Sequence, residues 1–405
     1  MSHFEKWCNA CDTPVREEAL FYCPACGGLL GFRYDLAGVA WDEAYAGSMW
    51  RYRTLLPVAD PKHIVSLHEG GTPMVPARSY PKHNVFYKDE MRNPTGSHKD
   101  RPLAVALSHA KRLGASTSIV ASTGSTGISN AALAARAGLN SVVVMTAGTP
   151  VERVYPMYAL GSKIVEVVGD VDEMVDELIR VCRREGFYLS STSRASNPYQ
   201  GEGNKTIAFE IFEQLGRVPN WMVVTVGGGG TISGIWRGFK DLVDIGLTDR
   251  LPKMVGVVPK DYNALEIGFE RSVSSWDEIL AMPFHDLPPS ILVKLAHPYP
   301  PDGADALAAV RESGGFFLGV SDDEALEAQF AIGRREGLYV EPSTSALLPA
   351  IDLLVERGEL ARDETLVALC CGSGFRETFT SAAIKPLETR TVAMDALPET
   401  LRAIA

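Results

Sequence analysis

A lysine in the stretch NPTGSHKDRP (Asn93 to Pro102) is placed where a side chain could do covalent chemistry. Lys99 follows His98 and a Pro-Thr-Gly turn, at the predicted start of a helix. An amine near a helix N-terminus and inside an apolar cleft has a lowered pKa, so it becomes a nucleophile toward an aldehyde. The alternative is a lysine whose amine reaches solvent, as most lysine amines do.

A run of glycines is a second candidate site. The stretch VTVGGGGTISG (Val224 to Gly234) reads as a buried strand, a glycine loop and a helix. Backbone N–H groups of such a loop can close around an anion, and a helix N-terminus favours negative charge. No Gly-Lys-Ser/Thr follows, so it is not a Walker loop, and it lacks the spacing of a dinucleotide fingerprint. A tight turn is the alternative, but the pattern favours a phosphate site made of Gly227, Gly228, Gly229, Gly230 and Thr231.

A third loop, ASTGSTGIS, has the same build of strand end, hydroxyls and glycines before a helix. Its hydroxyls could cap the helix, or its N–H groups could receive a substrate carboxylate, and both interpretations stay open. The candidate substrate-binding residues are Ser122, Thr123, Gly124 and Thr126. A phosphate loop combined with a reactive lysine is what pyridoxal phosphate requires, and we expect that cofactor.

Four of the seven cysteines share one pattern, C-x2-C-x11-C-x2-C. This spacing predicts a tetrahedral zinc site formed by Cys8, Cys11, Cys23 and Cys26. Two disulfides or four free thiols are the alternatives, and disulfides are disfavoured without a secretion signal. Four thiolates leave no open position for a substrate, so we expect a structural zinc, remote from the chemistry.

The net charge and the distribution of apolar residues indicate which kinds of partner this protein binds. The chain has 405 residues and a formal charge of −11, which disfavours nucleic acid or an anionic membrane as the main partner. Its first residues carry no apolar signal core, and no apolar run is long enough to span a bilayer. We expect a cytoplasmic protein with a small-molecule substrate.

Short apolar runs alternate with helical stretches from about residue 84. NVFYKDE, STSIVAS, SVVVMTA, SKIVEVV, WMVVTV, KMVGVV, GFFLGV and TLVALC predict strands, and segments 99–114, 125–138 and 170–186 predict helices. Segment 41–60 is expected to form a helix and an arm. The alternation predicts an α/β fold with parallel or mostly parallel sheets covered by helices. In such sheets ligands bind beyond the carboxyl ends of the strands, where the loops above lie.

Several motifs together resemble threonine synthase and related pyridoxal-phosphate enzymes, a group that includes the tryptophan synthase β subunit and serine dehydratases. EGGTPM, NPTGSHKDR, GEGNKTIAFEI, GGGGTISG and VEPSTSA occur in the family's order, and CGGLL resembles the end of its Cys module. The resemblance implies that Lys99 forms the Schiff base with pyridoxal phosphate and later moves protons at the substrate Cα. It also implies that residues 227–231 bind the cofactor phosphate. Cys371 would face the pyridine nitrogen, and Cys370 would pack in the core.

The resemblance also implies an arrangement of domains. We expect a zinc-ribbon-like module at 1–35, an arm at 36–83 belonging to the large domain, a smaller mobile α/β domain with Lys99 at 84–200, a large cofactor-binding α/β domain at 201–385 and a tail at 386–405. We expect a homodimer.

Three residues depart from the family pattern. Ser125 replaces the Asn that contacts the cofactor 3′-oxygen, His98 replaces Phe, and Ser373 replaces the His that follows the pyridine contact. The leading hypothesis is elimination or replacement at Cβ or Cγ of an amino acid, with O-phosphohomoserine to threonine as its strict form. These three departures indicate a substrate different from that of threonine synthases. The alternatives are β-replacement or deamination, as in cysteate synthase or threonine and serine dehydratases, and a zinc-ribbon binding protein on a decayed enzyme fold.

Overall fold

Two open sheets form the body of the computed structural model, which describes residues 3–17, 21–169, 171–191, 193–194, 196–273, 278, 280–281, 287–384 and 389–404. The larger sheet has the strand order β11-β10-β9-β12-β4-β3, and the smaller has the order β7-β6-β5-β8. All neighbouring strands in both sheets are parallel except β3, which pairs antiparallel with β4. The predicted α/β class with mostly parallel sheets is confirmed.

Every strand predicted between residues 84 and 370 is present. The strands are β1 (Phe4–Cys8), β2 (Leu30–Tyr34), β3 (Met74–Pro76), β4 (Asn84–Asp89), β5 (Thr117–Ala121), β6 (Asn140–Thr146), β7 (Lys163–Val167), β8 (Tyr188–Leu189), β9 (Trp221–Thr225), β10 (Lys253–Pro259), β11 (Phe316–Val320) and β12 (Thr365–Cys370). Short strands rich in Val and Ile form because both faces of a parallel sheet are buried under helices.

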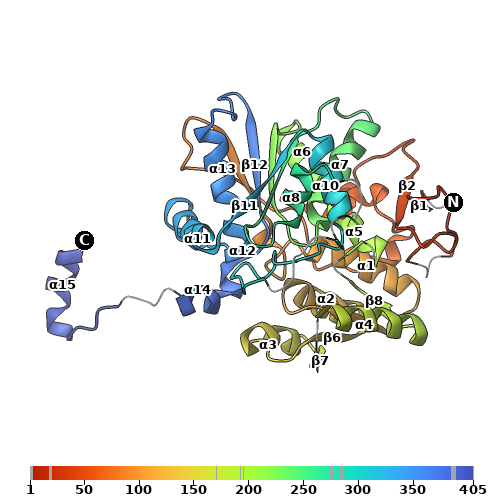
Figure 1. The fold of residues 1–405 in the computed structure, drawn as a ribbon, viewed down its shortest axis with the longest axis horizontal. Helices are drawn as coiled ribbons and strands as arrows, with labels where there is room; N and C mark the ends of the chain where they lie inside the picture. The colour runs from red at the N-terminus through yellow and green to blue at the C-terminus, as the bar shows by residue number, and fades with distance from the viewer. Residues whose placement is uncertain are drawn as a thin grey trace.

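Most of the described helices cover the two sheets, but the last one, α15 (Leu397–Ile404), lies apart from the body (Figure 1). The described helices are α1 (Asp100–Arg112), α2 (Ser125–Ala137), α3 (Val151–Ala159), α4 (Val171–Glu185), α5 (Pro198–Gly203), α6 (Lys205–Leu215), α7 (Gly230–Asp244), α8 (Ala264–Glu270), α10 (Gly303–Glu312), α11 (Asp322–Glu336), α12 (Pro342–Ser345), α13 (Leu347–Glu356), α14 (Thr378–Ile384) and α15. Short 3-10 helices are η1 (Glu43–Tyr45), η2 (Met49–Leu55), η3 (Pro61–His63), η4 (Glu90–Arg92), η5 (Gly374–Arg376) and η6 (Met394–Ala396).

Two predictions about the N-terminal half need correction. Segment 41–60 forms the short 3-10 helices η1 and η2 rather than one helix and an arm. Strand β4, predicted within the smaller domain, lies in the larger sheet, because it pairs along its whole length with β12. The smaller sheet therefore begins with β5, and Lys99 lies on the connection between the two sheets.

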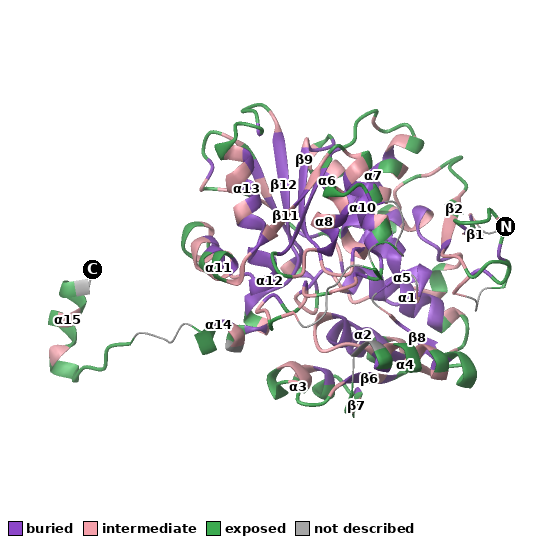
Figure 2. Ribbon diagram, in the orientation of Figure 1, coloured by how far each residue is buried: buried purple, intermediate pink, exposed green. Residues whose placement is uncertain are grey.

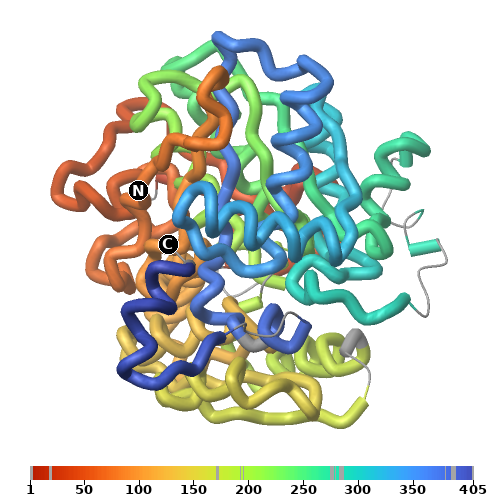
Figure 3. Tube along the Cα trace, turned by 90° about the vertical axis from the view of Figure 1, so that its left-hand side faces the viewer, coloured from red at the N-terminus to blue at the C-terminus, as the bar shows by residue number. Residues whose placement is uncertain are grey.

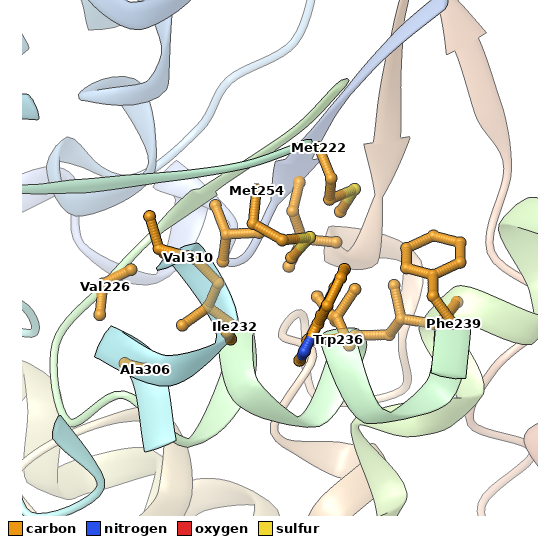
Figure 4. Packing of buried hydrophobic residues seen from close by; sticks show 14 of the residues in the cluster. Met222, Val226, Ile232, Trp236, Phe239, Met254, Ala306 and Val310 are labelled. Atoms are coloured by element: carbon orange, nitrogen blue, oxygen red, sulfur yellow. The ribbon is translucent and has the colours of Figure 1, made fainter. Parts of the chain in front are cut away.

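The main core is split by the larger sheet into two hydrophobic clusters. One contains side chains of β9, β10, α7 and α10 that interdigitate, including Met222, Trp236, Met254 and Val310 (Figure 4). The other lies on the opposite face, under α11 and α13. Figure 2 shows β9 and β12 buried along their length, whereas α15 is exposed. This rigid core fixes the carboxyl ends of the strands, where the candidate site lies.

The smaller sheet forms a separate layer beside the larger one, as the rotated view shows (Figure 3). Its strands are covered by α2, α3 and α4 (Figure 1). Among the described residues, no helix is both long and apolar enough to cross a membrane.

Candidate active site

One cavity of about 240 Å³ collects the residues that the sequence singled out. It lies beyond the carboxyl ends of β5, β9 and β12, so side chains from both sheets meet there. The predicted residues that line it are His98, Lys99, Ser122, Thr123, Gly124, Ser125, Thr126, Gly227, Gly228, Gly229, Gly230, Thr231 and Cys371. Residues up to 273 positions apart in the chain are thus brought to one site.

Lys99 is the residue immediately before α1, in helical backbone geometry. Burial lowers the pKa of its amine, and the nearby groups of Cys371, Asp302 and Glu341 only partly oppose this effect. A larger fraction of the amine is therefore uncharged than in a solvent-exposed lysine. This is the direction that the sequence predicted for a nucleophilic amine.

The imidazole of His98 is neutral and held at both nitrogens. Nδ1 lies 3.2 Å from the carbonyl oxygen of Cys371, which can only accept, so Nδ1 carries the proton. Nε2 then accepts from the Thr231 hydroxyl at 3.1 Å. Burial, followed by the charge of Lys99, holds the pKa of His98 well below its usual value. His98, which directly precedes Lys99, therefore contacts both the glycine loop at Thr231 and the end of β12 at Cys371.

The glycine loop is tightly enclosed by the segment around residues 294–302. A Cβ at Gly227 would lie 2.3 Å from the carbonyl oxygen of Lys294, and one at Gly229 would lie 2.6 Å from that of Asp302. Gly229 also has a φ of +93°, which favours glycine. The loop ends at the N-terminus of the 15-residue helix α7. Glycine is needed here by sterics, and the helix N-terminus supplies an electropositive wall.

The loop before α2 has a structural role that the sequence left open. The Ser122 hydroxyl oxygen accepts hydrogen bonds from the backbone N–H groups of Gly124 at 3.1 Å and Gly127 at 3.0 Å. Ser122 therefore shapes the first turn of the helix from a position two residues before the N-cap residue, Gly124. Ser125 accepts a hydrogen bond from Nη1 of Arg376 at 3.2 Å, a partner that lies on η5 after β12.

The two adjacent cysteines at the end of β12 point to different surroundings. Cys370 is fully buried in the core cluster under α11 and α13, as expected. Cys371 lines the cavity, and its sulfur lies 3.7 Å from the Thr225 hydroxyl. Burial raises the pKa of the Cys371 thiol to about 12. The side chain is therefore a neutral thiol and a weak hydrogen-bonding group.

A buried ionic network lies directly behind Lys99. Arg101 donates to Glu90, Glu210 and Thr206, and Lys88 also donates to Glu210, at distances of 2.7–2.9 Å. The side chains of Arg101, Lys88 and Glu90 are fully buried. The network ties the start of α1 to the end of β4 and to α6.

The sequence did not indicate a set of charged residues and one histidine in the cavity wall. Arg153 of α3, Lys294, His297 and Glu341 line the cavity, and Glu377 bonds to two of them. Only Glu341 falls in a motif that the sequence analysis quoted, and its position before α12 was the one available signal. Arg153, Glu377 and the pair Lys294 and His297 lie in three separate segments, so nothing in the linear pattern joins them.

The four predicted metal ligands converge in a small module formed by β1 and β2. The sulfur of Cys8 lies 3.5 Å from that of Cys26, the sulfur of Cys11 lies 3.6 Å from that of Cys23, and all four lie within 4.8 Å of one another. These separations exceed the roughly 2 Å of a disulfide bond. Four sulfurs at about 2.3 Å from a tetrahedral zinc would be about 3.8 Å apart, so the arrangement is compatible with zinc.

The module contacts the segment beside the glycine loop through Arg194. Its Nε donates to the carbonyl oxygen of Leu30 on β2, and its backbone N–H donates to the carboxylate of Asp302 at 3.0 Å. The backbone N–H of Asp302 in turn donates to the carbonyl oxygen of Gly228 at 2.7 Å. Arg194 and Asp302 thus connect the module to the glycine loop that lines the cavity.

Comparison with known proteins identifies the family. Residues 65–372 match the family described as pyridoxal-phosphate dependent enzyme. The chain is 34% identical to threonine synthase of Methanocaldococcus jannaschii over 94% of both chains, and 34% identical to that of Synechocystis over 82% of this chain and 84% of the relative.

Solved structures share the fold at lower identity. O-ureido-L-serine synthase superposes with a TM-score of 0.63 at 22% identity, covering 81% of this chain and 96% of the other. Threonine deaminase isoform 2 of Solanum lycopersicum gives a TM-score of 0.61 at 18% identity, covering 82% of each. The chain therefore belongs to the pyridoxal-phosphate-dependent enzymes and is a lyase related to threonine synthases.

Proposed function

We propose that this enzyme catalyses elimination or replacement at Cβ or Cγ of an amino acid whose leaving group is an anion. The observation that carries the proposal is the meeting of Lys99, the glycine loop and the neutral thiol of Cys371 in one cavity. O-phosphohomoserine to threonine is the strict form of this reaction, and the names of the similar proteins support it.

The residues fit pyridoxal phosphate. The glycine loop and Thr231 line the cavity at the N-terminus of α7, which favours an anion such as a phosphate. Lys99 would attach the cofactor, and Cys371 would face its ring nitrogen. When bound, the cofactor withdraws electrons from the substrate Cα. A neutral thiol cannot hold a ring nitrogen protonated as a carboxylate can, which suits elimination and replacement.

Different residues of this chain would then move the proton and bind the substrate carboxylate. The Lys99 amine would take the proton from the substrate Cα and later return one. The N–H groups at the start of α2 receive the substrate carboxylate, in a loop shaped by Ser122. The leaving group would depart with the electron pair of its C–O bond. In the strict form this bond is at Cγ, so Cβ would also lose a proton, Cγ would gain one, and water would then add its hydroxyl at Cβ.

Arg153 and Lys294 are the cations that would meet the anionic leaving group. Both line the cavity, one on α3 beside the smaller sheet and the other on the segment that encloses the glycine loop. A charge-assisted hydrogen bond from each would orient a phosphate or another oxyanion. The alternative function is β-replacement or deamination, which is favoured by the departures at Ser125, His98 and Ser373.

We further propose that the Cys module binds one structural zinc ion, that the protein is a homodimer in the cytoplasm, and that the smaller sheet moves relative to the larger one. The converging sulfurs of Cys8, Cys11, Cys23 and Cys26 support the first of these proposals.

Substrate profiling tests the reaction. The purified, cofactor-loaded enzyme is assayed with O-phosphohomoserine, O-phosphoserine and threonine, and products are identified by mass spectrometry. We expect phosphate release with formation of a new amino acid, or of a keto acid if deamination is the reaction. Borohydride trapping followed by peptide mapping should find the cofactor on Lys99. An enzyme that releases no leaving group from any of these compounds would contradict the proposal.

A further inference from the structure

Glu377 connects the two cations of the cavity wall. Its carboxylate is 2.6 Å from Nζ of Lys294 and also pairs with the guanidinium of Arg153. Lys294 pairs in addition with Glu341. These four residues come from α3, the segment before α10, the start of α12 and the end of η5. One carboxylate therefore joins charges that belong to both sheets.

The carboxylate of Glu377 is buried and ionised. Its side chain is 3% exposed, whereas those of Lys294 and Arg153 are 23% and 14% exposed. Burial alone would raise the pKa of Glu377, but Lys294 and Arg153 outweigh it and lower the pKa below its usual value. A permanent negative charge thus lies directly behind the two cations that face the cavity.

The charges of this group cancel. Lys294 and Arg153 contribute two positive charges, and Glu377 and Glu341 contribute two negative ones. A bare pair of cations would bind any free oxyanion that entered the cavity, including the leaving group after its bond has broken. With the two carboxylates in place, an arriving anion gains hydrogen bonds from the cations but meets repulsion from the carboxylates.

We propose that Glu377 is a positioning residue that acts as a resident counter-ion for the leaving group. Glu377 holds the side chains of Arg153 and Lys294 in place while the cavity is empty. It also lowers the affinity of these two cations for the free anion, so that the anion dissociates after elimination. The substrate still binds, because in the proposed function its carboxylate is held at the start of α2. This inference rests on the proposed function, since it concerns the release of that leaving group.

The test compares the wild type with Glu377→Gln in cofactor-loaded enzyme, with inorganic phosphate as the probe. Gln keeps the size of the side chain but removes its charge. We expect the dissociation constant of phosphate, measured by calorimetry, to fall at least tenfold in the variant. In the assay both KM and kcat should fall, with phosphate becoming a stronger inhibitor. Glu359→Gln, which removes an exposed carboxylate paired with Arg357, serves as the control and should leave phosphate binding unchanged.

Two further variants keep the inference testable if Glu377→Gln does not fold. Arg153→Gln and Lys294→Gln leave carboxylate in excess, so each should weaken phosphate binding below that of the wild type. An unchanged dissociation constant in a folded Glu377→Gln, or in both cation variants, would overturn the role of Glu377. Phosphate binding is measured without turnover, so these outcomes differ from a failure of the proposed function, in which no amino acid loses its leaving group.

Discussion

Replacing Glu210 by Gln tests whether the buried network behind Lys99 holds the site together. Glu210 accepts hydrogen bonds from Arg101 at 2.7 and 2.8 Å, from Lys88 at 2.8 Å and from the backbone N–H of Gly71 at 2.8 Å. Its side chain is 5% exposed, and those of Arg101 and Lys88 are fully buried. The substitution keeps the shape of the side chain and removes one negative charge.

The expected loss follows from the charges that remain. Two buried cations would then face only the carboxylate of Glu90, so one positive charge is left uncompensated. Breaking a buried ion pair in this way typically costs about 3–5 kcal/mol. Because Arg101 lies two residues after Lys99 and pins the start of α1, we expect the cofactor to bind more weakly as well.

Glu213→Gln is the matched control on the same helix. Glu213 is 27% exposed, pairs with Arg51 and accepts a hydrogen bond from the Tyr52 hydroxyl; Gln keeps an oxygen that can accept this bond, and partly exposed ion pairs typically contribute about 0–1 kcal/mol. Urea denaturation followed by circular dichroism gives the midpoints of both variants, and the visible absorbance of the cofactor reports on the site. Midpoints are compared because two sheets can unfold in separate steps. Equal midpoints for the two variants would refute the reasoning.

Four other predictions concern the site, the metal and the effect of pH. Lys99→Ala should abolish turnover and covalent attachment of the cofactor while the circular dichroism spectrum stays unchanged; a variant that still trapped the cofactor with borohydride would exclude Lys99. Elemental analysis should find one zinc ion per chain. Cys8→Ser should lose the zinc and melt at a lower temperature, whereas the control Cys182→Ser should retain it. Protein that is purified without chelator and contains no metal would contradict the site. Burial holds the pKa of His109 well below its usual value, so its imidazole is neutral in the folded protein. The free energy of unfolding is therefore highest above about pH 6.5, and it falls below that pH by up to about 1.4 kcal/mol per pH unit, because the unfolded chain binds the proton. His109→Gln should reduce this dependence of the free energy of unfolding on pH. Ser125→Asn with His98→Phe should raise kcat/KM for O-phosphohomoserine several-fold, because a matched hydrogen bond contributes about 1 kcal/mol; a wild type that already makes threonine at an ordinary rate would rule out an altered substrate.

Much of the fold could be read from local pattern. Short Val-rich runs such as WMVVTV form strands because a parallel sheet buries both faces, and each is followed by a helix with regularly spaced apolar residues. The helix expected within segment 41–60 is wrong: Met49, Tyr52 and Leu56 occur at helix-like spacing, but the chain there forms 3-10 turns packed against the body. Tertiary packing decided that geometry.

The boundary between the sheets also depended on long-range pairing. Strand β4 is followed in the chain by Lys99 and the smaller sheet, but it pairs with β12, some 280 residues later. The residues of β4 do not specify the strand with which it pairs, because every Val-rich strand has the same backbone donors and acceptors.

Residues that need special local geometry or a fixed short spacing could be recognised from the order of amino acids alone. The glycine loop, the lysine at a helix start and the four cysteines fall in this class, because each works through neighbours a few positions away. Only the tertiary structure brought Arg153, Lys294, Glu341 and Glu377 together, and it alone gave Ser125 a partner in Arg376. Charges interact through space and leave no periodic trace along the chain, so their grouping appears only once the two sheets have folded against each other.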